Sequence, residues 1–250
     1  MEKNWHLDRL DKVTYKFIFF INIMYDYGAI LWLITSCVLV RFMYRVMHKY
    51  VLVLNGKYTS LPEQRQMYIQ KNLVKSSYLA LLTIYAIFEI VWPVVQLNTW
   101  DNYVIHRLAA MYVSNDVVGL VCVNGLPKTT RIHHLITTVL VFISFGLDFQ
   151  HSEIAQAMLV YTMSSAAAYI VNFHLGVRWL CARDELKCLR YSAGCIYTTA
   201  CGVAWSWHLA WITTRPSLHI YHFIYLFLLA WIVRDDIILM RWLMQTPSSE

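Results

Sequence analysis

Two short groups of polar residues stand inside otherwise apolar stretches of the chain and could do chemistry there. Asn115 and Asp116 form one group, and His133 and His134 form the other. An imidazole and a carboxylate can share one proton, and the carboxylate then orients the ring and stabilises its charged form. Ionisable groups in a bilayer are costly, which makes each of them a functional candidate. The residues therefore predict a catalytic site made of His133, His134 and Asp116.

The spacing of the two groups limits how they can meet. Only the short turn 124–127 lies between their helices, which predicts antiparallel neighbours. Consecutive helical residues point about 100° apart, so His133 and His134 cannot both face one point. Asp116 is expected about two turns inside its helix and the histidines within the first turn of theirs, so contact requires tilt, an unwound turn or a bridging water. The alternative is structural, with the histidines at headgroup level and Asp116 simply paired with a polar neighbour.

The elements that carry these residues are predicted from composition. Of the 250 residues, 58% are hydrophobic and 14% charged, and the mean hydropathy is +0.45. A soluble domain of this composition would have too little polar surface to cover itself. The apolar residues come in long runs, which predicts an all-α, polytopic transmembrane helical bundle of about seven helices. The predicted spans are 22–45, 74–97, 104–123, 132–147, 154–177, 191–213 and 218–243.

These spans form one transmembrane domain, 22–243, followed by a short polar tail, 244–250. The N-terminal segment, 1–21, is charged and is expected either to lie on the membrane surface as an amphipathic helix or to be inside. The fourth span is short, so we expect it to begin one turn earlier or to be tilted. Pro93 predicts a kink near the end of the second span. The longest polar stretch, 45–72, contains a turn signal at Asn55–Gly56.

The distribution of basic residues predicts the orientation. The first, third and fifth loops hold Arg41, Arg45, Lys49, Lys57, Arg65, Lys71, Lys75, Lys128, Arg131, Arg178, Arg183, Lys187 and Arg190. The even loops hold only Arg107 and Arg215. The positive-inside rule then places the N-terminus in the lumen or outside and the C-terminus in the cytosol. Membrane topology accounts for the net charge of +6, so we expect acidic lipids and not nucleic acid as partners.

Other polar residues within the spans are weaker candidates. Asp26 and Glu89 are interpreted as interior partners, and Arg234, Asp235 and Asp236 as an internal ion pair that faces the bundle. The small residues around Ser164 allow close helix packing or leave room for an acyl chain. His219 and His222 share a helix face, but the remaining histidines are too scattered for a di-iron site. The six cysteines have no metal-binding spacing, so we expect no metal, cofactor or disulfide framework.

Two segments carry a resemblance to a known family. Tyr112-Val113-Ser114-Asn115-Asp116 and Arg131-Ile132-His133-His134-Leu135-Ile136-Thr137 resemble the TLC-domain family, which includes ceramide synthases and translocon-associated proteins. The resemblance covers roughly 22–243 and is specific between Tyr112 and Phe145. His133, His134 and Thr137 fit the start of the ceramide synthase signature. Its downstream acidic positions correspond to 161–166, which contains no carboxylate, so the chain resembles the non-ceramide-synthase branch.

The resemblance implies a multi-pass protein, commonly of the endoplasmic reticulum, that binds, senses or helps regulate membrane lipid composition or trafficking. It implies lipid contacts by Asn115, Thr137, Ser164 and Asn172. One alternative is an acyltransferase, in which a deprotonated imidazole attacks an acyl thioester; acyl-CoA or a sphingolipid would then be a partner. A second alternative is a seven-helix transporter or receptor, although the inverted repeats of many transporters are not evident. Whether the protein is an enzyme, which lipid it binds and its oligomeric state stay open.

Overall fold

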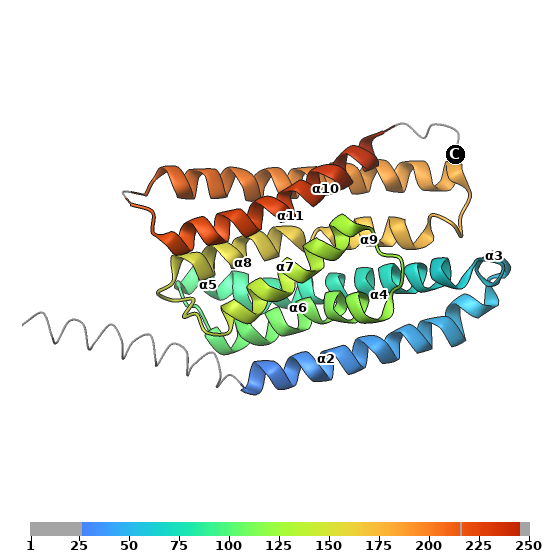
Figure 1. Cartoon of the computed structure of the whole chain (residues 1–250), viewed down its shortest axis with the longest axis horizontal. Helices are drawn as coiled ribbons and strands as arrows, with labels where there is room; N and C mark the ends of the chain where they lie inside the picture. Colours follow the sequence, from blue (N-terminus) through green and yellow to red (C-terminus); the bar gives the residue numbers. More distant parts are fainter. Residues whose placement is uncertain (1–26, 216, 246–250) are drawn as a thin grey trace, which may run out of the picture.

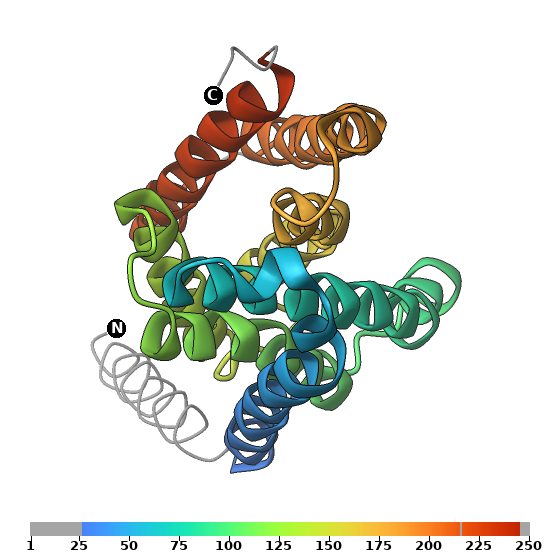
Figure 2. The same cartoon turned by 90° about the vertical axis from the view of Figure 1, so that its right-hand side faces the viewer.

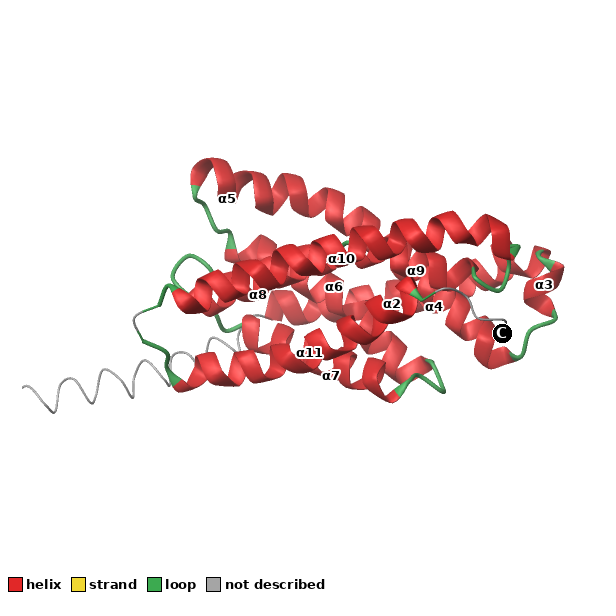
Figure 3. Cartoon of the chain, turned by 90° about the horizontal axis from the view of Figure 1, so that it is seen from above, coloured by secondary structure: helices red, strands yellow, loops and turns green. Residues whose placement is uncertain are grey.

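All regular structure in the described part of the chain is helical, as the sequence predicts (Figure 3). The computed structural model describes residues 27–215 and 217–245, so the segment 1–21, Asp26 and most of the tail 244–250 lie outside it. Three helical segments are long and apolar enough to cross a membrane, and they are Tyr27–Leu54, Glu63–Leu97 and Glu153–Val177. The count of seven spans stays a prediction.

The main helices run roughly along the long axis of the molecule (Figure 1). They are α2 (Tyr27–Val46), α3 (Gly56–Thr59), α4 (Glu63–Ala86), α5 (Trp92–Leu97), α6 (Asn102–Cys122), α7 (Lys128–Ser144), α8 (Glu153–Ser165), α9 (Ala168–Val177), α10 (Arg183–Thr213) and α11 (Ile220–Met244). Two of them begin well before their apolar runs: α4 starts 11 residues before Val74 and α10 starts 8 residues before Tyr191. α7 begins at Lys128, about one turn earlier than its apolar run, as expected for the short fourth span.

Six helices form a ring when the molecule is viewed along its length (Figure 2). In order, α6 contacts α4, α4 contacts α9, α9 contacts α10, α10 contacts α11, α11 contacts α7, and α7 returns to α6. α2 packs against α6 and also contacts α4. The ring places α6 and α7 side by side, which confirms that they are neighbours.

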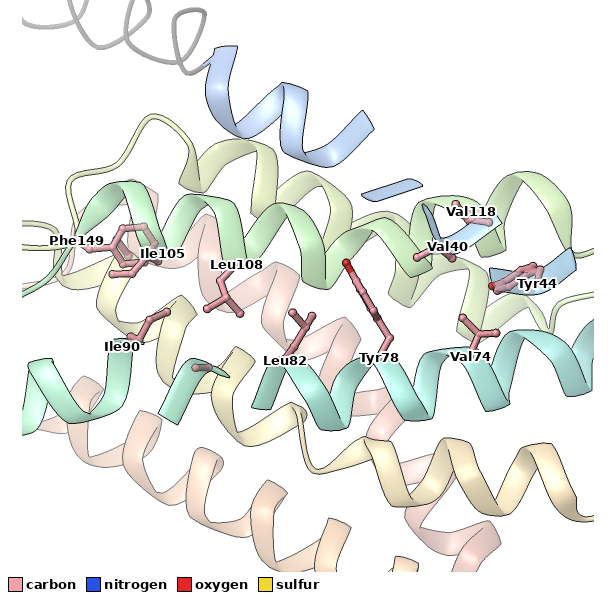
Figure 4. Packing of buried hydrophobic residues seen from close by; sticks show 12 residues of the cluster. Val40, Tyr44, Val74, Tyr78, Leu82, Ile90, Ile105, Leu108, Val118 and Phe149 are labelled. Carbon is pink, nitrogen blue, oxygen red and sulfur yellow. The ribbon is translucent and has the colours of Figure 1, made fainter. Parts of the chain in front are cut away.

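An apolar cluster joins α2, α4 and α6 (Figure 4). Val40 from α2, Val74 and Leu82 from α4, and Ile105 and Val118 from α6 are buried in it. Between helices surrounded by lipid, such contacts stabilise by van der Waals packing. The cluster holds together α4 and α6, two of the three helices that carry the polar residues described below.

Proline and asparagine shape the end of the helix that begins with α4. Pro93 has no backbone N–H, so a regular α-helical bond to the residue four positions earlier is lost there. The backbone accommodates this with a π-helical turn, Ile87–Val91, directly before α5. Asn98 ends α5 in the left-handed conformation, with φ of 50°. Glu89 lies on this turn and is exposed, so its prediction as an interior partner is wrong.

Side-chain hydrogen bonds stabilise two loops, the one between α7 and α8 and the one before α3. Asp148, in the loop between α7 and α8, accepts a hydrogen bond from Asn102 at 2.9 Å and contacts His151 at 2.6 Å. These two contacts, with that from Asn102 the larger, hold the pKa of Asp148 below its usual value. Asn55 caps α3 through Lys57 and Tyr58, which confirms the predicted turn.

We expect Gly176→Ala to destabilise the protein, because α4 and α9 approach closely at this residue. A Cβ on Gly176 would lie 2.6 Å from Cδ2 of Leu73 and 3.2 Å from its backbone nitrogen. Overpacking of this kind costs about 1–3 kcal/mol. Gly202→Ala, in α10, is the control: its Cβ would meet nothing within 4 Å, and the helix should gain about 0.5–1 kcal/mol. Reversible unfolding in bicelles would measure both changes, and equal effects of the two substitutions would contradict the expectation.

Candidate functional site

Four charged or titratable side chains meet inside the ring where α4, α6 and α7 adjoin. Nζ of Lys75 lies 2.5 Å from Oδ1 of Asp116, and Nδ1 of His134 lies 3.1 Å from the same oxygen. Nζ of Lys71 lies 2.9 Å from Nε2 of His134. All four residues are buried. We call Lys71, Lys75, Asp116 and His134 the ionic cluster.

The order of contacts in the ionic cluster assigns the proton on the His134 ring. A lysine ammonium can only donate, so Nε2 accepts from Lys71. Nδ1 then carries the proton and faces Oδ1 of Asp116. Lys75 donates to that oxygen. These contacts require only a neutral His134, and they tie three helices together, while Oδ2 of Asp116 has no hydrogen-bond partner among the described residues.

The contact between Asp116 and His134 is direct, without an unwound turn. Asp116 lies six residues before Cys122, where α6 ends, and His134 lies six residues after Lys128, where α7 begins. At 1.5 Å per residue, both are about 9 Å from their helix ends. The sequence placed His134 closer to its helix end because it began the helix at residue 132.

His133 points away from the ionic cluster. Its ring is at 86° to that of His134, with centroids 5.7 Å apart, in agreement with the expectation that the two cannot face one point. Nδ1 of His133 lies 3.2 Å from Oδ2 of Asp235 on α11. Pairing with a carboxylate fixes one ring nitrogen and leaves Nε2 for another partner.

The three charged residues of α11 separate, so their prediction as an internal ion pair is wrong. Asp235 contacts His133, and the buried Asp236 accepts hydrogen bonds from the hydroxyls of Tyr161 and of Tyr197, the latter at 2.7 Å. Arg234 is exposed, with its guanidinium 5.4 Å from the centroid of the Trp231 ring. Consecutive residues of one helix face different directions, which separates them.

A cavity lies between α4, α6, α7, α8 and α11. It contains about 960 Å³ of space not filled by protein atoms, including its open mouth. Most lining residues are aliphatic or aromatic, among them Leu82, Ile90, Ile105, Phe149 and Leu229. The polar side chains on its wall are Thr83, Tyr112, His133, Thr137, Ser144, Tyr161, Thr162, Ser165 and Tyr225. A mostly apolar pocket with a few polar groups is typical of a small-molecule site.

Several of these polar groups gather beside the ionic cluster. His133 and Thr137 are in the first turns of α7, and Tyr112 is one turn from Asp116 on α6. The hydroxyls of Tyr112 and Ser165 are 2.8 Å apart. A molecule in the cavity would therefore have mostly apolar surroundings, with one group of hydrogen-bonding side chains beside the ionic cluster and single ones, such as Thr83 and Ser144, elsewhere on the wall.

The residues predicted from sequence divide between the cavity and the packed interior. His133 and Thr137 line the cavity, whereas the described lining does not include His134, Asp116, Asn115, Ser164 or Asn172. Asn115 accepts a hydrogen bond from the Tyr44 hydroxyl at 3.3 Å. Ser164 and Asn172 bond to backbone carbonyls one turn earlier in the chain.

Sequence reasoning missed Lys71, Lys75, Tyr161 and Tyr197. Both lysines were counted as loop charges, although their spacing of four puts them on one helix face. Tyr78 and Leu82 continue that face and are also buried, which was a usable signal. Nothing in the sequence distinguishes the two tyrosines from the other phenols in apolar runs.

The described residues contain no group of three or more His, Cys, Asp or Glu side chains arranged to hold a metal ion. No family model, no curated protein and no solved structure matches this chain. The candidate site thus depends on its geometry, and the resemblance to the TLC-domain family stays a prediction.

Proposed function

We propose that this protein is a multi-pass membrane protein that binds a membrane lipid, with an acyl chain in the cavity and its polar end beside His133. The observation that carries the proposal is the cavity itself, which is apolar over most of its wall and polar next to the ionic cluster. The three apolar helical segments support the membrane location. Large apolar side chains on the outer surface, among them Phe42, Phe88, Val121 and Phe227, fit a lipid environment.

The finer parts of the proposal follow from the sequence. We propose seven spans, with the N-terminus in the lumen and the C-terminus in the cytosol, in a protein of the endoplasmic reticulum. Membership of the non-ceramide-synthase branch of the TLC-domain family is part of the same proposal. The direct contact between Asp116 and His134 supports it, because these residues belong to the two segments that carry the resemblance.

Filling the cavity tests this function. Ala109 lines the cavity on α6, and Ala109→Phe should displace the acyl chain. We expect at least about a tenfold loss of retained lipid, equivalent to about 1.4 kcal/mol, when the purified protein is released from nanodiscs and measured by native mass spectrometry. Ala210→Phe, at an exposed position of α10, is the matched control. Equal lipid retention by the two variants would refute a ligand in the cavity.

Acyl transfer is the second candidate, and the pairing of His133 with Asp235 at the cavity wall favours it. With Nδ1 held by the carboxylate, Nε2 would attack the carbonyl carbon of an acyl thioester, the C–S bond would break and the thiolate would leave, and Asp235 would stabilise the charged acyl-imidazole. A hydroxyl or amine of the acceptor lipid would then take the acyl group, its proton passing to the released thiolate, and Nε2 would be free again. Asp235 would then provide the acid that the segment 161–166 lacks. A new acylated lipid in cells that express the protein, absent with Asp235→Asn, would distinguish transfer from binding.

A further inference from the structure

Arginine and tryptophan side chains gather where α9 leads into α10. The guanidinium carbon of Arg178 lies 4.0 Å from the ring centroid of Trp179, and that of Arg65 lies 5.5 Å from the same ring. The guanidinium of Arg190 lies 4.8 Å from the Trp242 ring, which Arg178 also approaches, at 5.5 Å. We call Arg65, Arg178, Arg190, Trp179 and Trp242 the arginine–tryptophan cluster. Its residues come from α4, α10, α11 and the turn after α9.

Hydrogen bonds hold this cluster in place. Arg190 donates to the carbonyl oxygens of Trp242 and Leu243, the latter at 3.1 Å, and so satisfies backbone acceptors at the end of α11. Lys57 donates to the carbonyl oxygen of Leu180 at 3.2 Å, which adds a fourth cation beside the turn. The fold thus holds Arg190 and Lys57 by hydrogen bonds, and Arg65 and Arg178 by their contacts with the tryptophan rings.

Three cations of this region, Arg65, Arg190 and Lys57, have no carboxylate partner in the part of the chain that the structure describes. Within residues 27–215 and 217–245, no carboxylate oxygen lies within 4.0 Å of a side-chain nitrogen of Arg65, Arg190 or Lys57. Aromatic faces stabilise guanidinium groups, but they do not neutralise the charge. Like charges held together in this way favour an external anion. Guanidinium groups match phosphate in shape and can bind it through two parallel hydrogen bonds.

The surroundings indicate where the anion comes from. The cluster lies at the end of the bundle that the basic loops assign to the cytosolic side. Tryptophan is enriched at headgroup level, and the cytosolic leaflet contains anionic lipids that attract basic segments. Arg65 is exposed, and Arg178, Arg190 and both tryptophans are partly exposed, so a headgroup can reach them.

We infer that the arginine–tryptophan cluster binds the phosphate headgroup of an anionic lipid of the cytosolic leaflet. None of its members lines the cavity, so this site is separate from the one proposed above. It requires the membrane placement of the protein, but not the presence of a ligand in the cavity.

Charge reversal at Arg65 tests the inference without disturbing the interior, because this side chain is exposed and makes no contact that caps a helix. The full-length protein in phosphatidylcholine nanodiscs would be titrated with phosphatidic acid. We expect Arg65→Glu to weaken phosphatidic acid binding at least about tenfold. Arg131→Glu is the control, since it removes the same charge from an exposed position in the first turn of α7.

Three further measurements distinguish a specific lipid headgroup site from the alternatives. Equal weakening by Arg65→Glu and Arg131→Glu would overturn the inference, because it would indicate diffuse attraction to the whole basic surface. Full displacement of phosphatidic acid by an equal concentration of glycerol 3-phosphate would also overturn it, since the site would then prefer a soluble phosphate ester. Unchanged phosphatidic acid binding by Ala109→Phe would support a site independent of the cavity.

Discussion

Lys75→Met is expected to destabilise the protein by about 3–5 kcal/mol, because it removes the ammonium partner of a fully buried carboxylate. Asp116 would keep only His134 as a partner, and a neutral imidazole compensates the charge less well. Steric trapping in bicelles would measure the loss as a decrease in the free energy of unfolding. Lys128→Met removes an exposed lysine from α7 and should change the stability by no more than about 0.5 kcal/mol.

A double-mutant cycle separates the ion pair from simple loss of packing. Removing both charges, with Lys75→Met and Asp116→Leu together, should cost clearly less than the sum of the two single substitutions. The reason is that no buried charge is then left without its partner. If the costs of the single substitutions add, the pair does not interact and the ionic cluster is only a packing contact.

The two adjacent histidines should give opposite phenotypes. His134→Ala leaves Lys71 without its hydrogen-bond partner in the interior and Asp116 with Lys75 as its remaining partner, so we expect a loss of about 2 kcal/mol of stability. His133→Ala should change the stability by about 1 kcal/mol or less, because the ring borders the cavity and Asp235 is partly exposed. The same substitution should reduce retained lipid at least about tenfold.

Two measurements on each variant check this contrast, namely unfolding in bicelles and lipid analysis of cells that express the protein. We expect Asp116→Ala, like His134→Ala, to lower the free energy of unfolding. The contrary result is that His133→Ala, His134→Ala and Asp116→Ala all keep their stability and lose the lipid product, or the retained lipid, to the same extent. That result would show that both histidines act on the ligand. An unchanged lipid profile and unchanged retention in every variant would contradict both the binding and the transfer proposals.

Much of the helical framework could be predicted, because apolar runs and turn residues are local signals. The turn at 124–127 correctly made α6 and α7 neighbours, and the 100° step between residues correctly separated His133 from His134. The start of α4 could not be located from hydropathy alone. Its first turn, Glu63–Gln66, is polar and straight-chained, and such residues occur in helices as well as in loops, so hydropathy does not mark the boundary.

The partners of the site residues depend on tertiary packing, so the sequence did not reveal them. Lys71 and Lys75 read as cytosolic charges until α4 is seen to continue past them into the ring. Asp235 and Asp236 read as neighbours of Arg234 because they are adjacent in sequence, whereas their contacts are on α7, α8 and α10. Adjacency along a helix is a poor guide to contact, since only residues three or four apart share a face.

The position of α11 in the chain has a consequence for biosynthesis. His133 on α7, Tyr161 on α8 and Tyr197 on α10 are made before α11, the helix that supplies their carboxylate partners. Domains of a growing chain acquire structure from the N-terminal side first, so these three side chains enter the membrane with their polar atoms unmatched. Insertion of α11 then closes the ring and satisfies them together. The cavity is thus the last part of the protein to form, and before α11 inserts it is an open groove and these three polar side chains have no carboxylate partner.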